Sequence, residues 1–114
     1  MTIAVVIRDL LLFSRIEGAA SAAGASLTRV DTPDDLPRAE GVDLVLVDWT
    51  VREPSWSDQL RAWRSGAPSD RPRIITFGPH TDLQAHADAR DAGLGPMWAR
   101  SRLISRLPAL VRGE

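Results

Sequence analysis

The residues Val-Asp-Leu-Val-Leu-Val-Asp at positions 42–48 constrain the fold more than any other feature of the sequence. The run is almost continuously apolar, whereas a strand with one face in water alternates apolar and polar residues. The pattern therefore predicts a strand that is covered on both faces and lies at the centre of a sheet. Sheets of this kind are typically parallel, with helices packed on each side.

Strands and helices are predicted to alternate along the rest of the chain. Short apolar runs predict strands at 3–7, 26–30, 73–77 and 96–99. Helical spacing or capping residues predict helices at 11–23, within 31–41, from 54 onward, at 83–92, and after Ser105, which we expect to be the N-cap with Pro108 in the first turn. Residues 65–72 predict an exposed loop.

Five strand–helix pairs with right-handed crossovers predict a doubly wound five-stranded parallel sheet between two helical layers. This is a flavodoxin-like, three-layer α/β/α architecture, and we expect residues 1–114 to form a single domain.

The composition narrows the classes of partner. The net charge is −1, all fourteen basic residues are arginine and are scattered along the chain, so we expect neither nucleic acid nor a membrane as partner. Cysteine is absent, which excludes disulfides and cysteine-based zinc sites. The apolar runs are strand-sized and the N-terminus enters one at once, so we expect a cytoplasmic protein.

Candidate site residues are those that follow each strand, because ligands of doubly wound sheets bind at the carboxyl ends of the strands. These residues are Arg8, Asp9, Asp48, Trp49, Gly78, Pro79, His80, Ala99 and Arg100.

Three segments resemble CheY-like response-regulator receiver domains. Residues 43–48 resemble the third strand and phosphoacceptor aspartate, Arg8 and Asp9 resemble the acidic pair of the first loop, and residues 92–101 resemble the segment before the lysine–proline pair. The resemblance covers nearly the whole chain. It implies that Asp48 is the phosphoacceptor and that Asp9 and Asp48 would hold Mg²⁺.

The sequence departs from that pattern at three positions. Arg8 stands where the first acid is expected, Gly78 where a hydroxyl is expected (Thr76 lies nearby), and Arg100 where lysine is expected. Phosphoryl transfer to a carboxylate needs a metal ion and an ammonium group to compensate the charge on the oxygens. One remaining acid weakens Mg²⁺ binding, and arginine is not equivalent to lysine at such a site. We hypothesise that the Arg8 guanidinium lies beside Asp48 as a fixed cation.

Other conspicuous residues are interpreted more simply. Trp56 and Trp63 share a helix face and are expected to cover the core or an interface, and Trp98 is expected in the core. Trp49 is expected in a loop that is at least partly exposed. His80, Asp82 and His86 do not have the spacing of a metal site and are interpreted as surface residues.

The sequence also lacks a nucleophile motif and a glycine-rich phosphate loop, so we do not expect an enzyme.

The leading hypothesis is a stand-alone degenerate receiver (pseudo-receiver) without cofactor or output domain. It would bind another protein, a regulator, kinase or effector, in bacterial signalling. The resemblance implies that the last helix, the fifth strand and the preceding helix form its interaction face, and that a homodimer could pair there. One alternative is a genuine two-component phosphoacceptor that uses Asp48 with Asp9 and Mg²⁺. The other is a small-ligand or structural flavodoxin-like domain.

Overall fold

A computed structural model describes residues 1–67 and 72–114. Five parallel strands form one sheet in the order β2-β1-β3-β4-β5, which confirms the doubly wound prediction. Their bounds are Thr2–Val6 (β1), Ser26–Val30 (β2), Leu44–Asp48 (β3), Arg73–Gly78 (β4) and Trp98–Ala99 (β5). Of the loop predicted at 65–72, residues 68–71 lie outside the described part of the chain.

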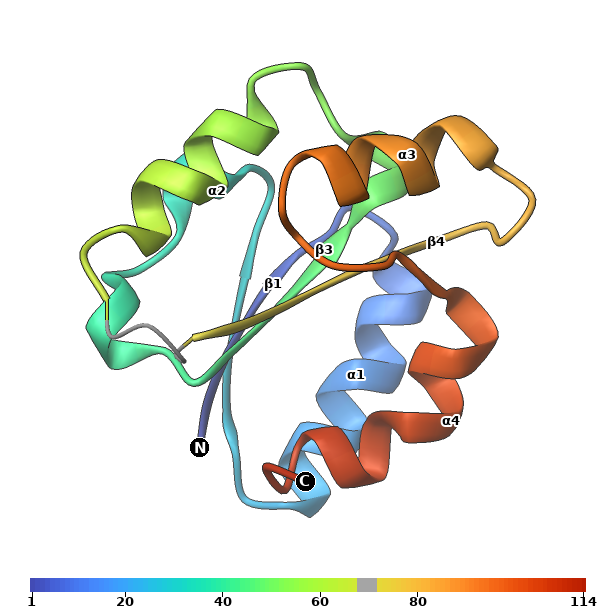
Figure 1. Ribbon diagram of the computed structural model, residues 1–114. Coiled ribbons are helices and arrows are strands. Elements are labelled where there is room, and N and C mark those ends of the chain that lie inside the picture. The colour runs from blue at the N-terminus through green and yellow to red at the C-terminus, as the bar shows by residue number, and fades with distance from the viewer. Residues whose placement is uncertain (68–71) are drawn as a thin grey trace.

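Helices cover both faces of the sheet, as Figure 1 shows. Helices α1 (Leu10–Ala22) and α4 (Arg100–Leu110) lie side by side on one face, and α2 (Trp56–Arg64) and α3 (Leu83–Asp91) lie on the other. Each face therefore has its own apolar core, and the three-layer architecture is confirmed. Among the described residues, no helix is long and apolar enough to cross a membrane.

Strand β3 is the central, fully buried strand that the sequence predicts. Its side chains alternate between the faces: Leu44 and Leu46 pack in the core under α1 and α4, and Val45 and Val47 in the core under α2 and α3. This alternation directs Asp48, the last residue of β3, toward the face of α1 and α4.

The connection between β2 and β3 differs from the predicted helix within 31–41. It contains two 3₁₀ turns, η1 (Pro33–Asp35) and η2 (Ala39–Gly41). Pro37 explains the difference, because proline disfavours helical backbone in the residue before it and has no N–H to donate. Leu36 is accordingly extended, with φ −63° and ψ 141°. The prediction of five helices was therefore wrong at this position.

Helix α4 begins earlier than predicted. The strand β5 has only two residues, and the helix starts directly after it, at Arg100, with Ala99 extended at the N-cap. Ser105 lies inside the helix, where its hydroxyl donates to the Arg102 carbonyl at 3.1 Å, so it is not the N-cap. Pro108 lies in the last turn instead of the first. The early start places Arg100 at the carboxyl edge of the sheet.

Candidate functional site

Asp9 begins the site at the carboxyl end of β1. It is the N-cap of α1, and its Oδ1 accepts hydrogen bonds from the backbone N–H groups of Leu11 (3.1 Å) and Leu12 (3.2 Å). Helix N-termini leave such N–H groups without partners, and an aspartate at this position satisfies them. One carboxylate oxygen of Asp9 therefore has a structural role.

Asp48 occupies the neighbouring position at the end of β3. Its side chain is only 2% exposed, and its Oδ1 accepts from the Thr50 backbone N–H at 3.1 Å. This bond caps the 3₁₀ turn η3 (Trp49–Val51). A buried carboxylate requires a compensating charge or hydrogen bonds, and the second oxygen of Asp48 obtains the charge from another element.

Arg100 joins the two carboxylates. Its Nη1 donates to Asp9 Oδ2 at 3.3 Å, and its Nη2 lies 3.6 Å from Asp48 Oδ2. The second distance is that of an ion pair without a direct hydrogen bond. Two carboxylates and one guanidinium thus meet where β1, β3 and β5 end. The sequence-predicted Asp9, Asp48 and Arg100 are brought together.

The surroundings of Asp9 favour its charged form. Its pKa is held below the ordinary value of 3.8, first by the hydrogen bond from the Leu12 N–H, then by that from Leu11 and by the Arg100 guanidinium, while partial desolvation acts in the opposite direction. Asp9 is therefore an anion at neutral pH, and the charge of Arg100 is shared between two carboxylates.

Arg8 lies elsewhere and does not supply the cation that we hypothesised. Its Nη2 is 3.7 Å from Glu53 Oε1, and its Cζ lies 5.9 Å from the centroid of the Trp56 ring. Strand alternation explains this position: Ala4 and Val6 face the core of α2 and α3, and Arg8 continues that series. Arg100, from the other side of the sheet, takes the role instead.

The register of β3 and β4 places Phe77 opposite Asp48. Phe77 is fully buried and belongs to the core of α1 and α4, the face toward which Asp48 points.

Gly78 is the last residue of β4, and a Cβ there would lie 3.0 Å from Met97 Sδ and 3.2 Å from Thr50 Oγ1. Neither Gly78 nor Thr76, which pairs with Val47, shares the face of Asp48. The residue beside the acceptor position is an apolar ring.

Trp49 is buried, at 1% exposure, although its position directly after β3 predicts partial exposure. Its indole N–H donates to the Ala85 carbonyl of α3 at 3.1 Å. The ring turns into the core of α2 and α3 because η3 folds it back under α3. The segment after Asp48 is thereby attached to α3.

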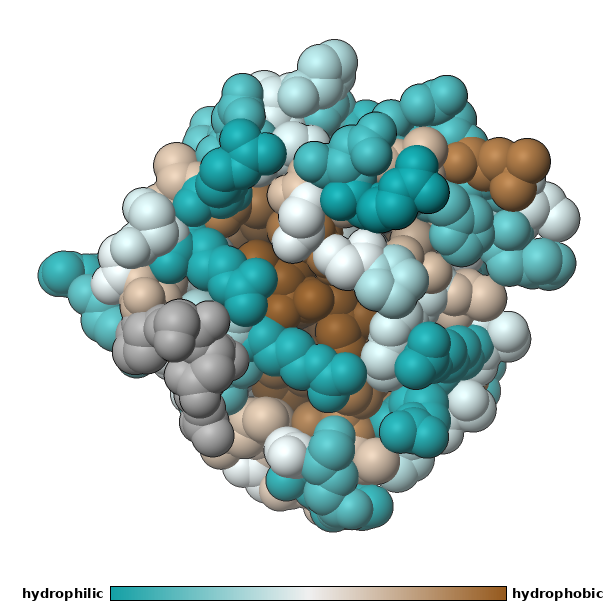
Figure 2. All heavy atoms as spheres, in the orientation of Figure 1, coloured by the Kyte–Doolittle hydropathy of each residue, from teal (hydrophilic) through white to brown (hydrophobic). Residues whose placement is uncertain are grey.

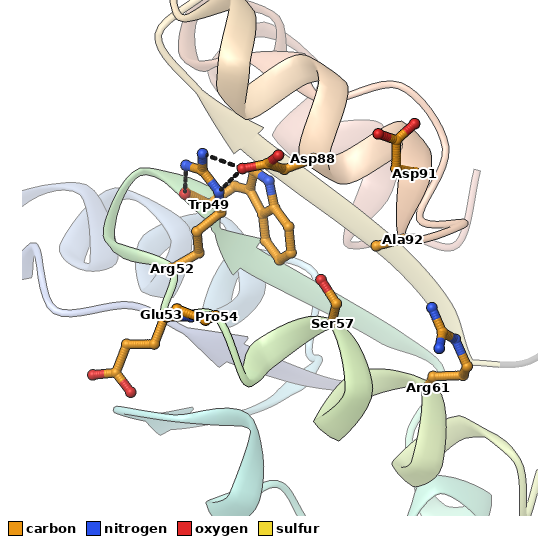
Figure 3. Close-up of a pocket in the computed structure, with 9 residues that line it drawn as sticks. All are labelled: Trp49, Arg52, Glu53, Pro54, Ser57, Arg61, Asp88, Asp91 and Ala92. Carbon is orange, nitrogen blue, oxygen red and sulfur yellow. Dashed lines mark hydrogen bonds and ion pairs between the residues drawn. The ribbon is translucent and has the colours of Figure 1, made fainter.

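Arg52, which no sequence motif identifies as a site residue, strengthens this attachment. Its Nη2 and Nε donate to Asp88 Oδ2 at 2.6 and 3.0 Å, and its Nη1 donates to the Trp49 carbonyl at 3.1 Å (Figure 3). These residues border a cleft of about 570 Å³ between α2 and α3. Figure 2 shows apolar residues in the middle of this side of the molecule, between hydrophilic side chains.

Asp82, His80 and His86 make contacts within the fold. Asp82 caps α3 by accepting from the Ala85 N–H, and His86 Nε2 is 3.0 Å from the His80 carbonyl oxygen. Within residues 1–67 and 72–114, no three histidine or acidic side chains are arranged to hold a metal ion.

The tryptophans differ in burial. Trp56 is fully buried and Trp98 is 7% exposed, which confirms both as core residues. Trp63 is half-buried, and its indole N–H donates to the Pro37 carbonyl at 2.7 Å.

Comparison with known proteins identifies the fold. No protein-family model matches the sequence, and no curated protein matches it. Solved structures do match. A CheY-like receiver domain from Methanospirillum hungatei has a TM-score of 0.67 and 15% identity, over 98% of this chain and 94% of that one. A response regulator from Thermotoga maritima has a TM-score of 0.67 and 17% identity, over 99% and 98%.

A third match carries a different description. A putative CpaE2 pilus assembly protein from Sinorhizobium meliloti has a TM-score of 0.60 and 16% identity, over 92% of this chain and 95% of that one. The chain therefore has the fold of CheY-like response-regulator receiver domains, as the sequence motifs indicate. In this chain Asp9, Asp48 and Arg100 lie together at the carboxyl ends of β1, β3 and β5.

Proposed function

We propose that this domain is a degenerate receiver that acts in signalling as a phosphorylation-independent protein-interaction module. One observation carries the proposal: Arg100 lies between Asp9 and Asp48, with its Nη atoms 3.3 and 3.6 Å from their Oδ2 oxygens. A receiver obtains positive charge at this place from a metal ion and a lysine, whereas here the guanidinium of Arg100 supplies it.

The oxygens available at this site are poorly suited to Mg²⁺. That ion requires near-octahedral oxygen ligands and usually keeps several waters. The Oδ1 atoms of Asp9 and Asp48 accept backbone hydrogen bonds, and both Oδ2 atoms face the Arg100 guanidinium. A magnesium ion would have to displace the Arg100 guanidinium from its two counter-charges.

The neighbours of Asp48 also argue against phosphoryl transfer. An acceptor carboxylate must be reachable, whereas Asp48 is 2% exposed and Phe77 is opposite it in the sheet. Arg100 would have to stabilise the negative charge that develops on the phosphoryl oxygens, although it already has two anionic partners. These contacts favour a site whose structure does not depend on phosphorylation of Asp48.

The second part of the proposal concerns the interaction face, which comprises α3, β5 and α4. The Trp49–Ala85 and Arg52–Asp88 contacts fix α3 to the segment that follows Asp48. Arg100 fixes the start of α4 to Asp9 and Asp48. Both helices are thus held relative to the sheet by internal contacts, which supports a face that is permanently competent to bind.

A genuine phosphoacceptor is the second candidate, because Asp9 and Asp48 do lie together around one cation. Amide NMR spectra recorded with Mg²⁺ and then beryllofluoride, a phosphoryl mimic, distinguish the two. Our proposal expects no shifts at the ends of β1 and β3. Shifts confined to those ends, and abolished by Asp48→Ala, would instead establish a phosphorylation switch.

A further inference from the structure

The segment before the last residue, Glu114, is basic and has no acidic residue. Between residues 92 and 113 the sequence has arginines at 100, 102, 106 and 112 and no aspartate or glutamate. Arg100 is used by the site, and Arg112 pairs with Glu114 at 2.6 Å. Arg102 and Arg106 remain, both exposed, and they lie one helical turn apart on α4.

Two exposed arginines, Arg102 and Arg73, stack on the ring of Trp98 in the edge strand β5. The Arg102 Cζ lies 4.0 Å from the centroid of the indole ring, and the Cζ of the exposed Arg73, from the start of β4, lies 5.7 Å from it. Stacking on an aromatic ring holds a guanidinium in place while its N–H donors remain available. Trp98 is 7% exposed, so it orients Arg102 and Arg73 and is not itself the contact surface.

Within the part of the chain that the structure describes, no carboxylate forms an ion pair with Arg73, Arg102 or Arg106. Exposed arginines elsewhere often have such partners: Arg61 pairs with Asp58, and Arg38 with Glu40. We define the Trp98 face as Trp98 with Arg73, Arg102 and Arg106. The Trp98 ring orients Arg73 and Arg102, and Arg106 adds a further positive charge one helical turn along α4.

We propose that the Trp98 face binds an acidic peptide segment of a partner protein. This inference rests on the proposed function, since it names the chemistry of the partner for the α4–β5 part of the interaction face. Planar guanidinium groups match carboxylates in bidentate geometry, and charge complementarity selects partners and accelerates association.

A nucleic acid fits this charge distribution less well. Protein–DNA affinity depends on many phosphate contacts, and the Trp98 face has three guanidinium groups on a chain of net charge −1. The connection between β2 and β3, which contacts α2, carries Asp34, Asp35 and Glu40, and these acids would repel a long polyanion. A short acidic segment neutralises the arginines without approaching those acids.

The test is a titration of ¹⁵N-labelled protein with a blocked hexaglutamate peptide at low salt. We expect the largest shifts at the Trp98 indole N–H and at the amides of α4. Arg106→Glu should weaken binding by roughly tenfold, Arg106→Lys should retain most of it, and Arg15→Glu should leave it within about twofold. Arg15 is the matched control, because it is exposed on α1 and has no ion pair with a described residue.

Three outcomes would overturn the inference. The first is peptide shifts spread over the surface and weakened equally by Arg15→Glu and Arg106→Glu. The second is tighter binding of a hexathymidylate oligonucleotide at the same residues. The third is self-association abolished by Arg106→Glu, which would assign the face to a second copy of the chain. The Mg²⁺ and beryllofluoride spectra report on other residues, so failure of the proposed function would be seen separately.

Discussion

The guanidinium of Arg100, at the first position of α4, lies 3.6 Å from the carboxylate of Asp48, the buried last residue of β3. The pair joins α4 to the central strand at the carboxyl edge of the sheet. Asp9 shares the same arginine, so three elements depend on one side chain. The stability of the domain and the chemistry of its site are therefore coupled.

Replacing Arg100 by alanine should destabilise the fold. Asp48 would keep its Thr50 hydrogen bond and lose its counter-charge while remaining buried. Removing one partner of a fully buried ion pair costs about 3–5 kcal/mol, and the 40% exposure of the Arg100 side chain reduces this to about 1–3 kcal/mol. Urea denaturation measures the loss, and Arg15→Ala, the exposed control, should stay within about 0.5 kcal/mol. Equal stability of Arg100→Ala and wild type would refute the coupling.

Replacing Trp49 by phenylalanine should loosen α3. The variant keeps an aromatic ring in the core but removes the N–H that donates to the Ala85 carbonyl at 3.1 Å. We expect a loss of about 1–2 kcal/mol from the missing hydrogen bond and the smaller ring. The substitution should accelerate the hydrogen exchange of the α3 amides more than that of the α1 amides. Unchanged exchange in α3 would show that Trp49 does not hold this helix.

Asp88 should contribute stability that depends on pH. Its pKa is lowered from the ordinary value of 3.8, first by the hydrogen bond from Arg52 and then by that from Gln84, with partial desolvation opposing them. A depressed folded-state pKa stabilises the fold above the unfolded-state value, and this stabilisation is lost as the pH falls through the folded-state value. The stability difference between wild type and Asp88→Asn should therefore be largest near neutral pH and shrink below about pH 4.

Urea denaturation of both proteins across that pH range provides the measurement. Asp91→Asn is the matched control, because Asp91 lies on the same helix with an exposed ion pair to Arg90 at 3.6 Å. A stability difference for Asp88→Asn that is the same at acid and neutral pH would contradict the assignment to the Arg52 interaction.

The sheet could be predicted because its signals are local. The almost continuously apolar run at 42–48 identifies the central strand. The alternation of strands and helices, with right-handed crossovers, fixes the layers and restricts the strand order. The departures occur where a local signal was overridden. Pro37 prevents the helix expected before Gly41, and the two-residue length of β5 allows α4 to begin at Arg100.

The partners within the site could not be predicted from the sequence. Arg8 and Arg100 both follow strands, and the choice between them depends on which face of the sheet each side chain takes. Strand phase directs Arg8 toward Glu53 and Trp56, and the start of α4 directs Arg100 toward Asp48. The burial of Trp49 depends on the turn η3, which no residue pattern in the sequence predicts.

Amide NMR titration of the wild-type protein and Arg100→Ala with Mg²⁺ tests the central claim most directly, since the claim is that Arg100 occupies the place of the metal. We predict that millimolar Mg²⁺ leaves the wild-type amides at the ends of β1 and β3 unshifted, and that the folded Arg100→Ala protein shows shifts there, because Asp9 and Asp48 then lack their cation. Site-specific Mg²⁺ shifts of equal size in the wild-type protein would contradict the account and favour a phosphorylation switch.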